Sequence, residues 1–249
     1  MKVIIVENYE EASQEAAKIF INQVKEKPNS ILGLATGSTP VRMYELLRED
    51  HEKNHTSYKD VKSYNLDEYF GLDASHPQSY HYFMYKNLFD HININPENIH
   101  IPNGMTDDVD AECERYDELI KEAGGVDIQV LGIGNNAHIG FNEPTINFEK
   151  GTHLVQLEDS TIEANSRFFD NIEDVPKKAI TMGVGSIFKS RKIMLIATGE
   201  NKAEAIYNTV YGKVVPEVPA SILQFHSDIV LILDKEAAKL LKEEDYKIA

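Results

Sequence analysis

The chain has 249 residues and no linker, low-complexity tract or internal repeat, so we expect a single domain over residues 1–249. The formal net charge of −16 argues against nucleic-acid binding and against an anionic membrane surface as partner. It does not exclude an anionic substrate, because a phosphate site is built locally from backbone amides and a few cations.

The single cysteine, Cys113, excludes an internal disulfide and fits a reducing compartment. It has no metal-ligand spacing to other Cys or His residues, so we interpret it as structural. The first apolar run is only four residues long, too short for a signal peptide or a membrane span. These features predict a cytoplasmic protein.

Short apolar runs alternate with amphipathic segments along the chain. In chain order, the expected elements are a strand at 3–6, a helix at 9–25, a strand at 31–35, a helix at 41–51, a strand at 61–66, helices at 79–89 and 110–122, strands at 127–133, 179–182 and 192–197, a helix at 200–211, a strand at 229–233 and a helix after residue 234. The alternation predicts an α/β fold, a mainly parallel sheet with helices on both faces. Ligands bind such sheets at the carboxyl ends of the strands.

The second expected strand leads into Thr36-Gly37-Ser38-Thr39-Pro40 and then a helix. Gly37, Ser38 and Thr39 offer backbone amides, hydroxyl donors and the positive end of a helix dipole, which suit an anion. The alternative is an ordinary helix cap with a turn glycine. The segment is neither a Walker P-loop nor a dinucleotide-binding GxGxxG motif.

The third expected strand ends in Asn65-Leu66-Asp67-Glu68-Tyr69, with two adjacent acids at the edge of the sheet. A partly buried carboxylate has a raised pKa and can act as a general base. Neighbouring side chains point in different directions, so we expect one catalytic acid, not two. The alternative is that Asp67 caps the next segment and Glu68 is solvated.

The most informative segment is GNNAHIGFNEP at 134–144, which directly follows the apolar run at 127–133. Its glycines and amides favour a tight loop that exposes side chains. His138 is a proton carrier near neutral pH, and Glu143 is close enough to orient it. A lone histidine is more often structural, and the eight others in the chain receive that interpretation.

Two cations, Arg167 and Lys202, each fall near a loop or a helix start. Arg167 can hold a phosphate through two parallel bonds, and Lys202 adds a point charge. Each alone is more often a solvated surface charge. Together they offer positive charge to an anion that the acidic remainder of the chain repels.

These motifs resemble those of the glucosamine-6-phosphate deaminase family nearly from end to end. The matching segments are LGLATGSTP at 32–40, NLDEYFGL at 65–72, SYHYFM at 79–84, DAECERYDELI at 110–120, GIGNNAHIGFNEP at 132–144, ANSRFFDN at 164–171 and TMGVGSI at 181–187. The resemblance implies a Rossmann-like fold, no metal or organic cofactor, and conversion of glucosamine 6-phosphate and water to fructose 6-phosphate and ammonia in amino sugar catabolism.

The resemblance also implies roles for the candidate residues. Asp67 resembles the base that moves a proton from C2 to C1 through an enolamine. His138 resembles the group that opens the sugar ring, and Glu143 the carboxylate that holds it. The substrate phosphate is expected on Gly37, Ser38 and Thr39, with Arg167 and Lys202 neutralising its charge.

The chain departs from the family pattern at two places. Many members carry an aspartate where this chain has Asn136, so this residue can hydrogen-bond His138 or substrate but cannot titrate. Hexameric members bind an acetylated amino sugar phosphate as activator through a Ser-Ser pair and an Arg-x-Lys. Ile146-Asn147, His153 and Val155 stand at those places here. We therefore expect no such activation, and a monomer or small homo-oligomer.

Two other functions stay open at this point. A 6-phosphogluconolactonase-like hydrolase would share the fold and the phosphate loop. A non-catalytic sugar-phosphate sensor would keep the pocket without turnover. The LDEY and HIGFNEP segments favour the deaminase over the hydrolase, and a sensor would require loss of Asp67 or His138, which are both present.

Overall fold

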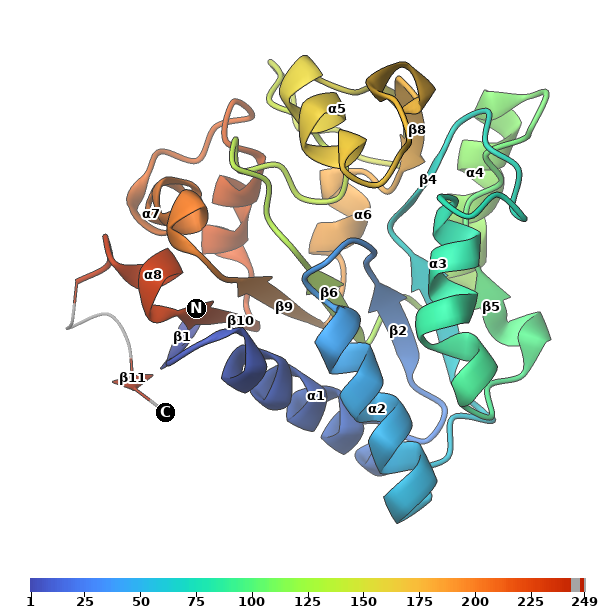
Figure 1. Cartoon of the computed structure of the whole chain (residues 1–249), viewed down its shortest axis with the longest axis horizontal. Helices are drawn as coiled ribbons and strands as arrows, with labels where there is room; N and C mark the ends of the chain where they lie inside the picture. The colour runs from blue at the N-terminus through green and yellow to red at the C-terminus, as the bar shows by residue number, and fades with distance from the viewer. Residues whose placement is uncertain (243–246, 249) are drawn as a thin grey trace.

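The computed structural model describes residues 1–242 and 247–248. Its main feature is a sheet of eight parallel strands in the order β11-β1-β10-β9-β6-β2-β3-β5 (Figure 1). The strands are β1 (Lys2–Val6), β2 (Ile31–Leu34), β3 (Lys62–Asn65), β5 (Ile99–His100), β6 (Ile128–Leu131), β9 (Lys192–Ala197), β10 (Ile229–Asp234) and β11 (Lys247–Ile248). The predicted α/β class with a mainly parallel sheet is confirmed.

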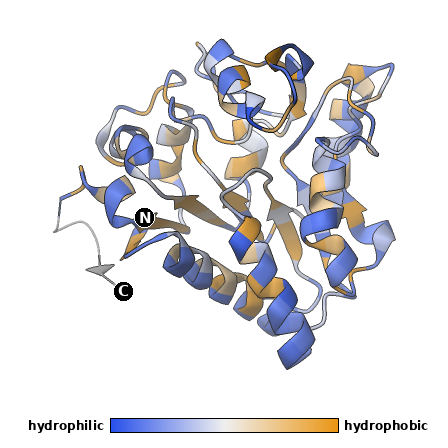
Figure 2. Ribbon diagram, viewed as in Figure 1, coloured by the Kyte–Doolittle hydropathy of each residue, from blue (hydrophilic) through white to orange (hydrophobic). Residues whose placement is uncertain are grey.

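Among the described residues, eight α-helices accompany this sheet. They are α1 (Tyr9–Glu26), α2 (Val41–Asn54), α3 (Tyr80–Asn87), α4 (Val109–Glu122), α5 (Asp159–Ser166), α6 (Val184–Phe188), α7 (Ala203–Tyr211) and α8 (Lys235–Ala238). Those that pack on the sheet keep their apolar residues toward it, whereas α5 packs beside a second, smaller core. Figure 2 shows the hydrophobic residues concentrated in the central strands, with hydrophilic residues along the outer surfaces of α1 and α2. Within the described part of the chain, no helix combines the length and the apolar character that a bilayer span requires.

A second sheet of three antiparallel strands was not predicted. It consists of β4 (Asp67–Tyr69), β8 (Lys178–Thr181) and β7 (His153–Gln156), in that order. The strand predicted at 179–182 therefore exists, but it does not join the parallel sheet. The strand predicted at 61–66 ends one residue early, and Asp67 begins the second sheet. Tyr69, Phe141, Leu157 and Ala179 form a small core of their own there.

The remaining predicted elements are confirmed with shifts of a few residues at their ends. The predicted helix at 200–211 is a short 3-10 helix, Glu200–Lys202, followed by α7. The helix predicted after residue 234 is α8, which ends at Ala238, and residues 243–246 lie outside the described residues. Cys113 is buried on α4, and burial together with nearby acids raises its pKa to about 11, which keeps the thiol protonated.

All strands of the main sheet run in the same direction, so the loops after β2, β3, β6 and β9 meet at one edge. Figure 1 shows α5 and β8 above that edge, on the side of the loop that joins β2 to α2. The second sheet and α5 thus add a wall where the parallel sheet ends.

Candidate active site

A cleft of about 710 Å³ opens at the carboxyl ends of the parallel strands. Eight of the nine residues predicted for the site line it: Gly37, Ser38, Thr39, Asp67, Asn136, His138, Arg167 and Lys202. The ninth, Glu143, is buried and contacts His138 from behind. The structure therefore brings together residues from five separate segments, as the sequence predicted.

One end of the cleft is formed by the loop between β2 and α2. Gly37 has a φ of +87°, a left-handed conformation that L side chains rarely adopt. Helix α2 begins after Pro40, and no side chain caps it. The ordinary helix-cap interpretation of Thr36–Thr39 is therefore wrong, because none of these side chains caps α2 and all of these residues line the cleft.

Two cations converge on this loop from distant segments. Arg167, at the end of α5, donates from Nη2 to Oγ of Ser38 at 3.3 Å. Lys202 donates from Nζ to Oδ1 of Asn135 at 2.8 Å. Burial, with the charge of Arg167, lowers the pKa of Lys202. A dianion at this end would relieve the repulsion between the two cations.

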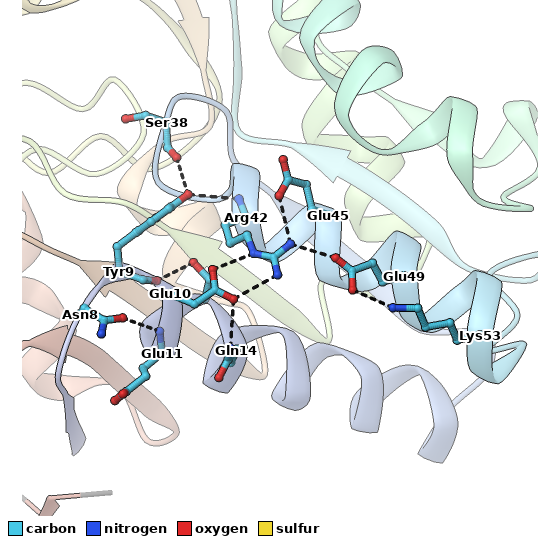
Figure 3. A network of polar contacts seen from close by, with 11 residues as sticks. Asn8, Tyr9, Glu10, Glu11, Gln14, Ser38, Arg42, Glu45, Glu49 and Lys53 are labelled. Carbon is cyan, nitrogen blue, oxygen red and sulfur yellow. Dashed lines mark hydrogen bonds and ion pairs between the residues drawn. The ribbon is translucent and has the colours of Figure 1, made fainter.

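A tyrosine that sequence reasoning missed holds the same loop in place. Tyr9 lines the cleft, and its hydroxyl donates to the backbone oxygen of Ser38 at 3.0 Å and accepts from the backbone N–H of Arg42 at 3.1 Å. The Arg42 guanidinium binds three glutamates, Glu10, Glu45 and Glu49, at 2.8 to 3.1 Å (Figure 3). Arg42 therefore joins α1 to α2 below the loop and is not available to an anion.

Asp67 lines the same cleft from β4 and is 6% exposed. Burial, reinforced by the negative charge of Glu68, raises the pKa of Asp67 to about 8. The cleft wall across from it includes Gly140, where an added Cβ would lie 3.4 Å from Oδ2 of Asp67. The carboxylate thus faces open cleft beside a backbone without a side chain.

Glu68 is not solvated, and that alternative is wrong. It is 2% exposed, and its two oxygens accept from the backbone N–H groups of Tyr69, Tyr80 and His81 at 2.8 to 2.9 Å. Glu68, not Asp67, therefore binds the amino end of α3. Burial raises the pKa of Glu68, and the three N–H donors counteract this. The two neighbouring side chains point in different directions: Asp67 lines the cleft, and Glu68 binds backbone N–H groups at the start of α3.

His138 and Glu143 lie in direct contact, with Nδ1 of the ring 3.2 Å from Oε2 of the carboxylate. Burial alone would raise the pKa of Glu143, but His138, Thr161 and Asn136 outweigh it and lower that pKa to about 2. Glu143 is therefore a permanent anion beside the ring. Gly134 makes room for the ring, because a Cβ there would lie 2.4 to 2.7 Å from three of its atoms.

Further residues line the cleft that were not predicted as site residues. Besides Tyr9, they include Tyr80, Phe141, Thr161 and Asn165. The rings of Tyr80 and Phe141 are stacked, with centroids 5.9 Å apart and planes at 15°. An aromatic wall of this kind suits the apolar face of a sugar. Tyr80, Phe141 and Asn165 lie inside segments that resemble the family, but only tertiary packing shows that their side chains line the cleft.

The fold and this cleft define an α/β enzyme for small anionic substrates, with a cationic end and a proton-transfer end in one cavity. Residues 7–231 match the family described as glucosamine-6-phosphate isomerases/6-phosphogluconolactonase. The chain belongs to that family.

Relatives and solved structures agree with this assignment. The chain is 64% identical over 248 residues to a glucosamine-6-phosphate deaminase of Clostridium botulinum (strain Eklund 17B / Type B), and 58% identical to one of Clostridioides difficile (strain 630), with 100% of each chain covered. A monomeric glucosamine-6-phosphate deaminase superposes with a TM-score of 0.94 at 47% identity, over 96% of this chain and 100% of that one. A 6-phosphogluconolactonase from Trypanosoma cruzi shares the fold, with a TM-score of 0.78 at 19% identity over 97% of each chain.

Proposed function

We propose that the protein is a glucosamine-6-phosphate deaminase, which converts glucosamine 6-phosphate and water to fructose 6-phosphate and ammonia. The observation that carries this proposal is that Asp67 and His138 open into the same cleft as Ser38, Arg167 and Lys202. Relatives of that name match over the full length at 58 to 64% identity. One phosphorylated sugar can therefore contact all five residues at once.

In the proposed reaction, His138 moves a proton from the anomeric hydroxyl to the ring oxygen and opens the ring. Asp67 then removes the proton from C2 while the C1 carbonyl oxygen gains a proton, which gives an enolamine. Asp67 returns its proton to C1, and the nitrogen loses a proton, which leaves an imine at C2. Water adds to C2, the amino group leaves as ammonia, and the C2 carbonyl of fructose 6-phosphate remains. A pKa of about 8 suits Asp67 for removal of the C2 proton, because a weakly acidic C–H requires a strong base.

The test is to measure ammonia and fructose 6-phosphate from glucosamine 6-phosphate, with a metal chelator present. We expect both products in equal amounts. Hydrolysis of 6-phosphogluconolactone without ammonia release would favour the lactonase. Binding of glucosamine 6-phosphate without turnover would favour a sensor. Either outcome would contradict the proposal.

We further propose that the enzyme is a monomer or small homo-oligomer without activation by N-acetylglucosamine 6-phosphate. A second cavity of about 300 Å³ is lined by Asn147, His153 and Val155, together with the carboxylates of Glu143, Glu149 and Glu158. These acids repel an anionic activator. The rate curve should be hyperbolic, and a sigmoidal curve made hyperbolic by the acetylated sugar phosphate would refute this. We place the protein in the cytoplasm, which agrees with its single buried thiol.

Replacing Arg167 by alanine should mainly raise KM. The substrate phosphate loses a charge-assisted bond of about 1.5–3 kcal/mol, a factor of roughly 10 to 150 in KM. Arg167→Lys keeps the positive charge but loses the planar guanidinium with its paired donors. Its KM should lie between those of the parent and of Arg167→Ala. Steady-state kinetics of both variants check this, and a lower kcat at constant KM would point away from a phosphate contact.

Replacing Glu68 by glutamine should move the pH profile of kcat/KM to lower pH. The substitution removes the negative charge that helps to raise the pKa of Asp67, so the base becomes available earlier as pH increases. The variant should also be less stable, since glutamine cannot accept all three N–H bonds at the start of α3. A profile that does not move would show that burial alone sets the Asp67 pKa.

A further inference from the structure

The side chain of Asn136 lies between two carboxylates and uses both of its N–H donors. Its Nδ2 donates to Oε2 of Glu143 and to Oε2 of Glu158, both at 2.9 Å. Its Oδ1 accepts from the backbone N–H of His138 at 3.2 Å. An aspartate at this position would lose both donors and would place three carboxylates next to one another.

Glu158 supplies the outer of the two carboxylates. It is the residue before α5, yet its side chain does not cap that helix. The side chain reaches back to Asn136, and its own backbone N–H points to Oε1 of Glu143 at 3.4 Å. Glu143 also accepts from the hydroxyl of Thr161 on α5 at 2.6 Å. The start of α5 is thus bonded to both sides of the Asn136–Glu143 pair.

We propose that Glu158 is a positioning residue for His138, and that its carboxylate, bonded through the Asn136 amide, orients Glu143 against the ring. This inference rests on the proposed function, because it concerns how His138 is held during ring opening. The amide at 136 and the acid at 158 then form a pair. An uncharged donor is required at 136 because an acid stands at 158. A change at one position therefore alters which side chain is tolerated at the other.

The effect of substituting Asn136 or Glu158 depends on the groups that face these two side chains. His138 and Glu143 lie on the cleft side, and the hydroxyls of Thr161 and Ser160 lie on the α5 side. With Asn136→Asp, the new carboxylate would lie against the carboxylates of both Glu143 and Glu158, where the amide now donates to each. With Asn136→Asp and Glu158→Gln together, the number of carboxylates returns to two, and the glutamine amide can donate to the new aspartate.

The experiment is a double-mutant cycle of N136D, E158Q and N136D/E158Q, with kcat, KM and Tm measured for each. Glu163→Gln, an exposed glutamate on the same helix, is the matched control and should stay within about twofold of the parent in kcat. We expect E158Q to lower kcat about 10-fold with little change in KM, in the range seen for groups that orient a catalytic ligand. The kcat of N136D should fall further than that of E158Q, and the kcat of the double variant should be at least about 10-fold higher than that of N136D.

Three results would overturn the proposal: E158Q that behaves like E163Q, a double variant no faster than N136D, or a loss of kcat that disappears once the rates are corrected for the unfolded fraction given by Tm. The parent enzyme is assayed first. If it releases no ammonia, the proposed function fails; if it does and the rescue is absent, the positioning role fails.

Discussion

The variant Asp67→Asn should turn over glucosamine 6-phosphate about 10² to 10⁴ times more slowly than the parent, with KM within a few-fold. Asparagine keeps the shape of the side chain and leaves the cationic end of the cleft unchanged, but it cannot accept the C2 proton. The measurements are ammonia release and, in D₂O, exchange of the C2 proton followed by NMR. Asp60→Asn, an exposed acid outside the cleft, is the control. Near-normal proton exchange in the variant would show that another base acts.

The same substitution should raise stability, because Asp67 opposes folding once it ionises. Its pKa rises from 3.8 to about 8 on folding, so the folded state favours the protonated form. The stabilising contribution is fully present below pH 3.8 and is lost as pH increases toward and through 8. A neutral asparagine avoids this loss. Tm should therefore be higher for Asp67→Asn than for the parent, most clearly at pH 9. An equal or lower Tm at that pH would contradict the conclusion that ionised Asp67 destabilises the folded state.

The pKa of Asp67 also sets the pH dependence of the parent enzyme. The base must be deprotonated to remove a proton, and at pH 7 most of the free enzyme carries a protonated Asp67. kcat/KM should therefore rise between about pH 6 and 9, and Asp67→Asn should lack this rise. A maximum below pH 6 would exclude Asp67 as the base.

Replacing His138 by glutamine should lower kcat by about 10²-fold or more, since ring opening loses its proton shuttle. Glutamine can keep a hydrogen bond to Glu143 but does not titrate. His91→Gln, a histidine on the exposed surface outside the cleft, is the matched control and should change little. Steady-state rates on the cyclic substrate check this. An undiminished rate would mean that the open form arises without His138.

The sequence predicted the parallel sheet and the site because both are encoded locally. Each strand-end loop has its own motif, and parallel strands bring such loops to one edge. The antiparallel second sheet was missed because its strands are short and because β4 pairs with β8, which lies more than 100 residues later in the chain. Tyr9 and Glu158 were missed for a related reason: each acts through a partner that is distant in the chain or hidden behind the cleft. The location of Arg42 between three acids also depends on how α1 and α2 pack.

Gly134 has a consequence for how this gene can vary. Any single-base change in a glycine codon that alters the amino acid introduces a residue with a Cβ, and the His138 ring already occupies that space. Every missense mutation at this codon should therefore displace the imidazole without touching it chemically. Saturation mutagenesis scored by growth on amino sugars would then find residue 134 as intolerant as the histidine itself.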